Sequence, residues 1–374
     1  MTPSRTPDVV IAHDYLTQRG GAERVVLALH RMFPDAPIYT TLYDPEGTFE
    51  EFRSARVITS PMNRVGVFRR DHRAALPLLP LASSAVHARG TIALISSSGW
   101  AHGFRFDGPS LVYCHTPARW VYLTDEYLGG PWYRSPKGIV VQALKPLLRR
   151  WDRAAARRRT RYVANSTVVR RRIEEVYGRE DVGLVFPPHS VDTAGALEPI
   201  VAAQQLGEGY LLVVSRLMPY KNVDRVIAAV QATGDRLLVI GRGPERDRLA
   251  DQAGPETVFA QDLSDAQLRW AYARAAALVA VSHEDFGITP LEASAWGIPT
   301  VALRAGGYLD TIDEAVNGVY VDSPEVEDVA AGLLRVRQRT WDSAAIRAHA
   351  ERFSEERFAA QIRAELDGVR AQGR

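Results

Sequence analysis

Short runs of consecutive apolar residues, bounded by turn-forming residues, recur along the whole chain. Such runs are typical of parallel strands that are buried on both faces. Between them, apolar residues recur at spacings of three and four, as at Ala22, Val25, Val26 and Leu29, which places one apolar stripe on a helix. Because strands and helices alternate, the pattern predicts an α/β fold. The predicted strands are DVVIAH, APIYTTLY, ARVITS, TIALISSS, SLVYCH, RYVANS, VGLVFPP, YLLVVS, RLLVIG, TVFA, ALVAVS, PTVAL and GVYVD.

The alternation is interrupted once, between residues 187 and 209, where prolines, glycines and polar residues dominate. We place a hinge there and predict two doubly wound, Rossmann-like domains, residues 1–190 and 205–350, which face a deep cleft. The last apolar stripe, in residues 354–374, predicts a helix that could pack back on the first domain or end on the second. Ligands of doubly wound sheets bind beyond the carboxyl ends of the strands, so candidate site residues are sought there.

Charge is distributed unevenly along the 374 residues. The net charge is +2, yet residues 145–172 hold eleven Lys and Arg against the single Asp152. The only cysteine, Cys114, cannot form an internal disulfide, which favours a reducing compartment such as the cytoplasm. The sequence has neither the pattern of a signal peptide nor a run of about 18 apolar residues, so we expect no membrane span.

The segment SHEDFGITPLEASAWG follows the strand ALVAVS and carries two carboxylates, Glu284 and Glu292. Glu292 has two interpretations. Thr289 could cap a helix with Glu292 at its third position, which is a capping box that needs no ligand. Alternatively, Glu292 binds a ligand together with Glu284, which lies in a loop where a carboxylate gains nothing structural.

A second segment, SRLMPYKN, follows the first strand of the second domain and offers Arg216 and Lys221. Two cations at a strand end suit a diphosphate, although a solvated loop is the alternative. The pairs Gly20–Gly21 and Gly306–Gly307 precede predicted helices, where backbone amides can bind an anion, or where glycine only permits a tight turn. IGRGPER lacks the third glycine of a dinucleotide fingerprint, which argues against an NAD site.

Two further strand ends carry histidines. His115 ends the strand SLVYC, and His13 and Asp14 follow the first strand, although buried histidines are more often structural than functional. No Asp-x-Asp pair occurs in the sequence, so no obvious carboxylate pair bridges a metal ion to a diphosphate. We therefore expect a site that needs neither metal nor cofactor.

Together these segments resemble glycosyltransferase family 4 on a GT-B fold, over nearly the full chain. The resemblance is carried by GGAERV, YCHTPARWVY, ANSTVVRRRIEEVYG, SRLMPYKN, EDFGITPLEASAWGIPTVA and AGGYLDTI. The segments HEDFGITPLEA and YCHTP resemble the corresponding segments of O-antigen and capsule mannosyltransferases. The resemblance implies transfer of a sugar, with retention of configuration, from a nucleotide diphosphate to a lipid-linked or glycan acceptor in cell-surface polysaccharide or glycolipid synthesis. GDP-mannose is the expected donor, and a UDP-sugar is the alternative.

The resemblance also assigns roles to residues. Glu284 would hold hydroxyls of the donor sugar, Glu292 would bind the ribose, and His115 would lie near the reacting carbon. Arg216 and Lys221 would neutralise the leaving diphosphate. The backbone amides expected to reach the donor are those of Phe286, Gly287 and Ile288, assisted by Gly20, Gly21 and Gly307.

The basic segment ALKPLLRRWDRAAARRRTRY predicts a helix ringed by arginines. Its functional interpretation is contact with the anionic inner face of the cell membrane or with a diphosphate-linked lipid acceptor, while a solvated helix end is the alternative. A second patch, MNRVGVFRRDHRAALPLLPLA, mixes arginines with apolar residues as an interfacial segment would. The arginines proposed for this surface are Arg69, Arg70, Arg149, Arg150 and Arg153, and those ringing the helix include Arg157, Arg158, Arg159 and Arg161.

Two other functions compete with sugar transfer. The arginine-rich helix could bind nucleic acid, but the charge is confined to one segment and no known reading motif is present, so no nucleic-acid partner is expected. A nucleotide-sugar epimerase of the same fold is the other alternative, although those enzymes lack the E-x7-E motif formed here by Glu284 and Glu292.

Overall fold

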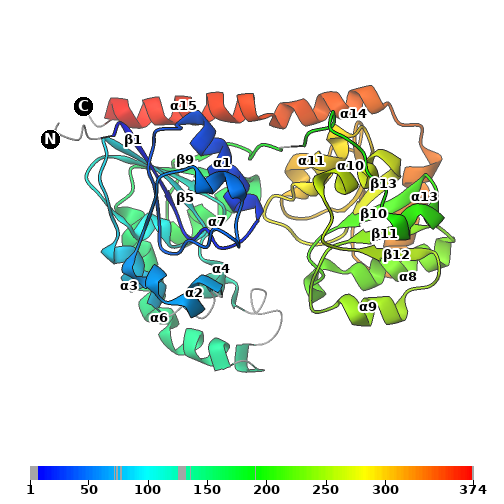
Figure 1. Ribbon diagram of the computed structural model, residues 1–374, viewed down its shortest axis with the longest axis horizontal. Coiled ribbons are helices and arrows are strands. Elements are labelled where there is room, and N and C mark those ends of the chain that lie inside the picture. The colour runs from blue at the N-terminus through cyan, green and yellow to red at the C-terminus, as the bar shows by residue number, and fades with distance from the viewer. Residues whose placement is uncertain are drawn as a thin grey trace. The chain divides into compact units, whose positions relative to one another are not determined.

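A computed structural model describes residues 7–70, 72, 75, 78–124, 132–134, 136–189 and 191–372. The chain divides into two compact units, the first comprising Met1–Pro188 with Glu355–Arg374 and the second His189–Ser354. Each unit is built on one parallel sheet with helices on both faces (Figure 1). The predicted α/β class with two Rossmann-like domains is therefore confirmed.

The sheet of the first unit has seven strands in the order β3-β2-β1-β5-β7-β8-β9, and all neighbours are parallel. Every one of these strands lies within a predicted run. Strands β1, β5 and β7 are buried at every position, whereas the outer strands β3 and β9 are half-buried. A separate two-stranded sheet pairs β4 (His87–Ala88) with β6 (Arg105–Phe106) and was not predicted. The seven strands are β1 (Val9–His13), β2 (Ile38–Thr40), β3 (Val57–Thr59), β5 (Ile92–Ser97), β7 (Ser110–Cys114), β8 (Arg161–Ala164) and β9 (Val182–Leu184).

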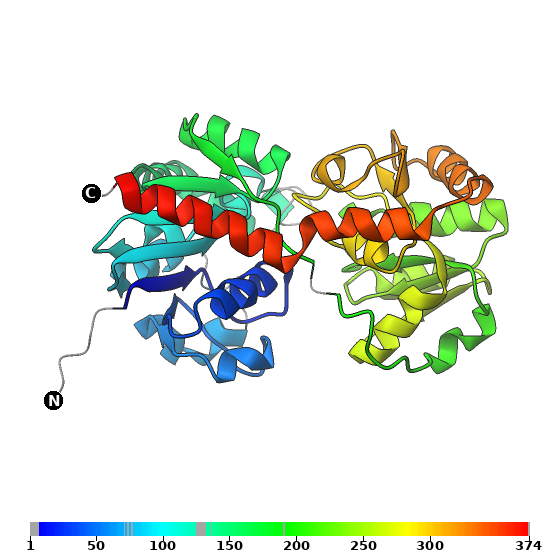
Figure 2. The same cartoon turned by 90° about the horizontal axis from the view of Figure 1, so that it is seen from above.

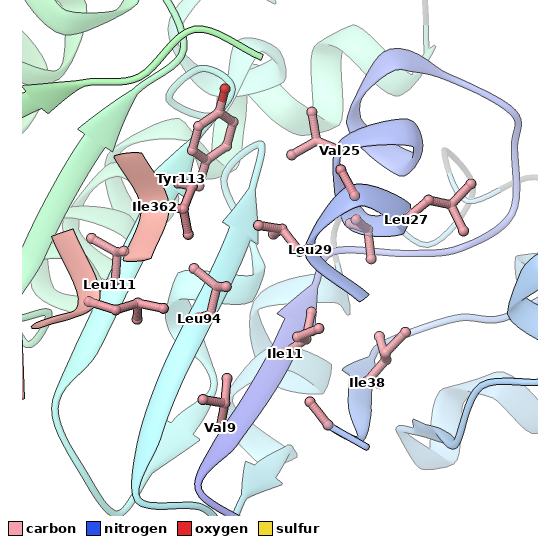
Figure 3. Close-up of a cluster of buried hydrophobic side chains, with 14 of the residues drawn as sticks. Val9, Ile11, Val25, Leu27, Leu29, Ile38, Leu94, Leu111, Tyr113 and Ile362 are labelled. Carbon is pink, nitrogen blue, oxygen red and sulfur yellow. The ribbon is translucent and has the colours of Figure 1, made fainter. Parts of the chain in front are cut away.

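Two clusters of buried side chains, one on each face, attach the helices of the first unit to its sheet. On one face, α1 (Gly21–Met32) and the C-terminal helix α15 (Glu355–Gln372) pack against β1, β5 and β7 (Figure 3). Helix α15 contributes Phe358, Ile362, Leu366 and Val369, so the predicted C-terminal helix belongs to the core of the first unit and lies along it in Figure 2.

The opposite face of this sheet is covered by α7 (Thr167–Tyr177). The long helix α6 (Pro136–Arg157) packs beside α2 (Gly66–Arg70), α3 (Leu79–Ala85) and α4 (Arg119–Tyr122) around a smaller cluster that includes Trp100 and Trp120. Among the described residues, the short 3-10 helices of this unit are η1 (Glu50–Arg53), η2 (Pro61–Arg64), η4 (Ala101–Gly103) and η5 (Trp132–Arg134).

The sheet of the second unit has six parallel strands in the order β12-β11-β10-β13-β14-β15. All six were predicted. They are β10 (Tyr210–Val214), β11 (Leu237–Ile240), β12 (Thr257–Ala260), β13 (Ala275–Ala280), β14 (Thr300–Leu303) and β15 (Gly318–Val321). One face carries α8 (Val223–Thr233), α9 (Arg246–Gln252) and α13 (Val326–Gln338), and the other carries α10 (Asp265–Arg274), α11 (Thr289–Ala295) and α12 (Tyr308–Thr311).

The segment after Pro188 joins the second unit. Within it, η6 (Val201–Leu206) buries Ala203 and Leu206, and the preceding Ile200 joins them in the core cluster beside β10 and α10. The unit ends with α14 (Ser343–Ala350) and η8 (Glu351–Phe353). The backbone of His189 donates a 3.1 Å hydrogen bond to the carbonyl of Phe353, so the first and last segments of this unit meet.

Both sheets reverse their strand order at one place, between β1 and β5 in the first unit and between β10 and β13 in the second. At such a switch point the loops at the carboxyl ends of the two strands diverge and leave room for a ligand. The candidate residues that follow β1, β5, β10 and β13 are therefore placed where the fold favours binding.

Candidate active site

In the second unit, Lys221 and Glu284 form an ion pair at the switch point. Lys221 ends η7 (Pro219–Lys221) in the segment after β10, and Glu284 lies in the loop after β13. The two side chains are only 13% and 18% exposed, so the pair is shielded from solvent on most sides. The segments SRLMPYKN and SHEDFGITPLEASAWG, each predicted separately to carry site residues, are therefore in contact.

The position of Lys221 is fixed by the next residue, Asn222. Its backbone adopts a left-handed conformation with φ of 54°, which ends η7 and starts α8. Its side-chain Nδ2 donates a 2.8 Å hydrogen bond to the carbonyl of Val281, the residue that follows β13. Asn222 therefore ties the lysine segment to the glutamate segment, a role that its place in SRLMPYKN did not reveal.

Glu284 has a second partner. The hydroxyl of Ser282 donates a 2.8 Å hydrogen bond to Glu284 Oε1 and lies 3.3 Å from the hydroxyl of Tyr308. Burial, together with the negative charge of Glu284, raises the pKa of Tyr308 well above its ordinary value, so this hydroxyl keeps its proton. The carboxylate is thus oriented by one cation and one hydroxyl.

Glu292 lies in the first turn of α11 and is 7% exposed. The capping-box interpretation is wrong, because Thr289 is already helical, Ile288 is the N-cap, and no side chain caps this helix. Glu292 Oε2 instead accepts a 2.9 Å hydrogen bond from the hydroxyl of Tyr272 on α10. Glu292 is thus a buried carboxylate with a hydrogen bond from a neighbouring helix, and its binding of a ligand stays a prediction.

The glycines of this unit permit the close approach of two loops. The Gly307 amide donates a 2.8 Å hydrogen bond to the carbonyl of Glu284, so this amide is used within the protein rather than being available to a phosphate as expected. A Cβ on Gly307 would lie 2.2 Å from the Cα of Phe286. Gly287 has φ of +78°, and a Cβ there would lie 2.3 Å from the ring of Tyr308.

The other predicted residues of the second unit make contacts of their own. Arg216 is exposed, and its Nη2 donates a 3.0 Å hydrogen bond to the hydroxyl of Tyr220. Phe286 is 5% exposed and lies beside Phe353, with 6.1 Å between ring centroids. The carbonyl of Ile288 accepts the amides of Leu291 and Glu292, which begins α11.

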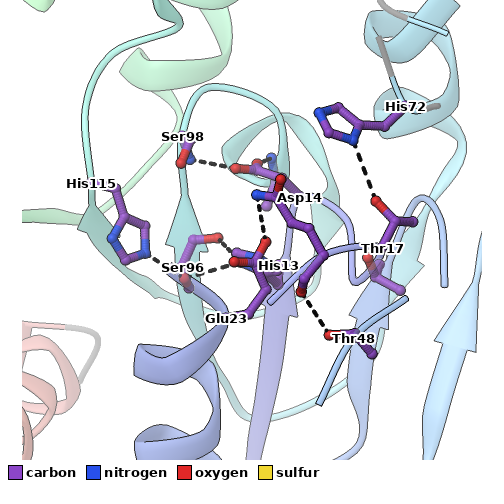
Figure 4. Close-up of polar contacts among 12 residues, drawn as sticks. His13, Asp14, Thr17, Glu23, Thr48, His72, Ser96, Ser98 and His115 are labelled. Carbon is purple, nitrogen blue, oxygen red and sulfur yellow. Dashed lines mark hydrogen bonds and ion pairs between the residues drawn. The ribbon is translucent and has the colours of Figure 1, made fainter. Parts of the chain in front are cut away.

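In the first unit, a chain of polar contacts crosses the switch point and ends at His115 (Figure 4). Ser96 Oγ lies 2.8 Å from His115 Nε2 and 3.0 Å from His13 Nδ1. His13 Nε2 lies 3.8 Å from Glu23 Oε1 on α1. Burial alone would lower the pKa of His13, but the attraction of Glu23, Asp14 and the Ser96 carbonyl outweighs burial and raises this pKa above 6.5.

Asp14, the other polar residue that follows β1, has a structural role. Its carboxylate accepts the backbone amides of Ser98, Trp100 at 3.0 Å and Ala101 at 2.6 Å, and also the hydroxyl of Ser97 at 3.2 Å. Four donors on one carboxylate fix the loop that follows β5. Asp14 therefore shapes the edge of the sheet where His115 lies.

Gly20 and Gly21 begin α1 as predicted, Gly20 as its N-cap. The Glu23 carboxylate folds back towards this end of the helix, since a Cβ on Gly20 would lie 2.6 Å from Glu23 Oε2. A Cβ on Gly21 would have no atom within 4 Å, so space is open above this residue. Glu23 and Ser96 were not identified from the sequence.

The arginines of residues 149–161 do not all ring one helix, as the sequence had suggested. Helix α6 ends at Arg157, and Arg161 lies in β8, where its Nε donates a 2.9 Å hydrogen bond to Glu365. Arg159 is buried against the ring of Phe106. These two arginines stabilise the first unit itself. Arg158 is exposed in the turn that follows α6.

A basic surface remains on α6. An open basin of about 460 Å³ is lined by Pro146, Arg149, Arg150, Arg153, Ala154 and Arg157. Apolar side chains are exposed on the same helix, with Leu147 at 65% and Ile139 at 51%. Arg69 and Arg70 are exposed at the end of the neighbouring α2, so this part of the unit exposes both cations and apolar side chains.

No group of three or more potential metal ligands occurs among the described residues. Within the same part of the chain, none of the helices is long and apolar enough to cross a bilayer.

Two family models match the chain and divide it as the structure does. Residues 19–194 match a model described as Glycosyltransferase Family 4, and residues 200–353 match one described as Glycosyl transferases group 1. The chain is 34% identical over 201 residues to a D-inositol 3-phosphate glycosyltransferase of Mycolicibacterium smegmatis, covering 50% of this chain and 45% of that protein. It is 36% identical over 131 residues to a GDP-mannose-dependent alpha-mannosyltransferase of Mycobacterium tuberculosis, covering 34% of each.

The matched regions span about half or less of the length of these curated relatives. Solved structures match over almost the full chain but at low identity. HepE from Anabaena in complex with UDP superposes with a TM-score of 0.71 at 17% identity, covering 96% of this chain and all of that one. Sucrose-phosphate synthase from Thermosynechococcus elongatus gives 0.72 at 19% identity, covering 98% of this chain and all of that one. The chain therefore carries a family 4 and a group 1 glycosyltransferase domain, in that order, on a GT-B fold.

Proposed function

We propose that the protein transfers a sugar from a nucleotide diphosphate to an acceptor, with retention of anomeric configuration. The observation that carries this proposal is the shielded Lys221–Glu284 pair at the switch point of the second unit, with Glu292 held nearby in the first turn of α11. A cation at this place suits a diphosphate, and carboxylates suit sugar hydroxyls. Both glycosyltransferase domain matches support the same assignment.

The chemistry follows from the charge that develops. The bond between the anomeric carbon and the diphosphate oxygen breaks, and a new bond forms from that carbon to an acceptor hydroxyl. Negative charge grows on the leaving diphosphate and is stabilised by Lys221 and Arg216. The acceptor approaches from the side that the diphosphate leaves, and its proton passes to a phosphate oxygen, so the products are the glycoside and the nucleoside diphosphate.

GDP-mannose is the donor we favour. The α-mannosyltransferase relative uses GDP-mannose by its name, and the resemblance of HEDFGITPLEA to mannosyltransferases points the same way. The solved relative from Anabaena holds UDP, so a UDP-sugar is the alternative. Thermal unfolding with the nucleoside diphosphates GDP, UDP, dTDP and ADP identifies the base of the donor, because a ligand that binds only the folded protein raises its melting temperature. We expect the largest shift with GDP, and a larger shift with UDP would overturn the choice of base.

The reaction class has its own test. The protein is incubated with a sugar donor of the nucleoside diphosphate that raises the melting temperature most, and with a lipid-linked or glycan acceptor. The expected products are the nucleoside diphosphate and an α-linked glycoside, whose anomeric configuration is measured by NMR. An inverted product would contradict retention. Nucleotide-sugar conversion in the absence of any acceptor would indicate an epimerase instead.

The acceptor is proposed to be presented at an anionic membrane surface, which would place the protein at the inner face of the cell membrane. Support comes from the arginine-lined basin on α6 and the exposed apolar side chains beside it. Arginines attract anionic headgroups while apolar side chains enter the interface, and together they suit peripheral binding.

A further inference from the structure

Four buried side chains of the first unit form a continuous chain from helix α1 to the carboxyl end of β7. Glu23 is 1% exposed, His13 1%, Ser96 0% and His115 9%. His13 and Ser96 are register partners of the two strands that flank the switch point. Among these four residues, the family resemblance gives only His115 a role, near the reacting carbon, so the three residues behind it need another explanation.

The direction of the hydrogen bonds can be worked out from one atom. His13 Nδ1 lies 3.1 Å from the backbone carbonyl of Ser96, and a carbonyl can only accept, so this nitrogen carries a proton. The same nitrogen lies 3.0 Å from Ser96 Oγ, which leaves the hydroxyl hydrogen of Ser96 to point elsewhere. His115 Nε2, at 2.8 Å from Ser96 Oγ, is in position to accept it. His115 is then neutral, with its proton on Nδ1.

Glu23 keeps this direction from reversing. Burial without a counter-charge favours a neutral imidazole, whose single proton could move to Nε2 and free Nδ1 to accept from Ser96. The Glu23 carboxylate, 3.8 Å from His13 Nε2, opposes the effect of burial and favours protonation of both nitrogens. Gln18 Nε2 holds the carboxylate in turn through a 3.1 Å hydrogen bond.

We propose that Glu23, His13 and Ser96 are positioning residues that hold His115 as a neutral imidazole with its proton on Nδ1. The consequence for catalysis rests on the proposed function. In sugar transfer the anomeric carbon gains positive charge as its bond to phosphate breaks, and an imidazolium beside it would oppose that step. A neutral ring that still offers one N–H avoids this repulsion.

The tautomer can be measured without substrate. In the full chain labelled with ¹⁵N-histidine, two-bond ¹H–¹⁵N correlations report which ring nitrogen is protonated, and His115→Gln assigns the signal. At mildly alkaline pH we expect His115 to carry its proton on Nδ1. Ser96→Ala should move the proton to Nε2, the form that free imidazole side chains favour, whereas Ser96→Thr, which keeps the hydroxyl, should not. Ser110→Ala, a buried serine at the opposite end of β7, is the matched control.

A kinetic measurement complements the spectra. Ser96→Ala should lower kcat about fivefold with little change in KM, since the roughly 1 kcal/mol of one hydrogen bond is lost. A proton on Nε2 in the unaltered protein, or an unchanged tautomer in folded Ser96→Ala, would overturn the inference. Lack of glycoside product together with the expected spectra would count against sugar transfer alone and would support the assignment of the tautomer.

Discussion

Lys221 and Glu284 form an ion pair across the switch point of the second sheet, although 63 residues separate them in the sequence. Each comes from a loop that follows a strand, and Asn222 links the two loops through the carbonyl of Val281. Because the pair is largely shielded from solvent, removal of one side chain leaves the other charge without a partner, which destabilises the protein. The geometry therefore couples the charges of the two residues, and the variants below test whether the pair acts as one unit in catalysis.

Replacement of Lys221 by alanine should lower turnover by about a hundredfold or more, because one preorganised cation for the leaving diphosphate is lost. Release of nucleoside diphosphate in the presence of donor and acceptor measures the effect. Arg225→Ala is the matched control, since Arg225 forms a more exposed ion pair with Glu325 at 3.1 Å and should change turnover little.

A double-mutant cycle tests whether the pair acts as a unit. Lys221→Ala, Glu284→Gln and the double variant should be strongly non-additive, with the double variant losing much less turnover than the product of the two single losses. Losses that simply multiply, in proteins whose melting temperatures are unchanged, would show that the contact between Lys221 and Glu284 has no functional meaning.

Tyr272→Phe should weaken binding of the nucleoside diphosphate by about two- to tenfold, because Glu292 loses the hydrogen bond that orients it. Isothermal titration with the preferred diphosphate measures this. Tyr210→Phe removes another buried hydroxyl of the same unit, one that donates a 2.8 Å hydrogen bond to the carbonyl of Ala271. That control should lower stability but not affinity, and equal losses of affinity in both variants would contradict a specific role for Tyr272.

The strands of both sheets could be predicted from the sequence because short runs of consecutive apolar residues, bounded by turn-forming residues, are typical of buried parallel strands. Even β2 and β3, which have only three residues each, lie within such runs. Strands β4 and β6 were missed because each is two residues long and offers no period to detect. The capping box failed for a different reason, since Glu292 satisfies the motif but is held by Tyr272 from another helix.

The site could be predicted only where a motif stands beside a strand end. Lys221 and Glu284 met this condition. Glu23 and Ser96 did not, because their relation to His13 depends on the register of β1 with β5 across 83 residues and on how α1 packs over them. Arg159 was misjudged because a run of arginines gives no sign that one of them is covered by Phe106.

The stability of the protein should depend on pH through His13. A histidine whose pKa is raised in the folded state stabilises the fold fully below its unfolded value of 6.5, and this contribution is lost as pH rises through the folded pKa. Glu23→Gln removes the main attraction that raises the pKa. The free energy of unfolding of the native protein minus that of Glu23→Gln should therefore be largest in mild acid and shrink as pH rises above 6.5.

Chemical denaturation between about pH 5.5 and 9 measures this difference, a range in which other carboxylates stay ionised. The lowered pKa values of His30, His189 and His349, which burial causes, act in the opposite direction, but they are present in both proteins and cancel. A difference that is constant or grows with pH would contradict the assignment of a charged His13.

Charge reversal on α6 should reduce binding to anionic vesicles. Arg150 and Arg157 are exposed and line the basin. Each basic residue near an anionic membrane surface contributes about 1 kcal/mol to binding, so the double variant Arg150→Glu, Arg157→Glu should bind at least about 30-fold more weakly. Sedimentation with vesicles that contain or lack anionic lipid measures the change, which added salt should diminish in the native protein. Arg363→Glu, at an exposed position of α15, is the matched control and should leave binding nearly unaltered. Equal sedimentation of the native protein with neutral vesicles would show that apolar side chains such as Leu147, rather than the arginines, account for the attachment.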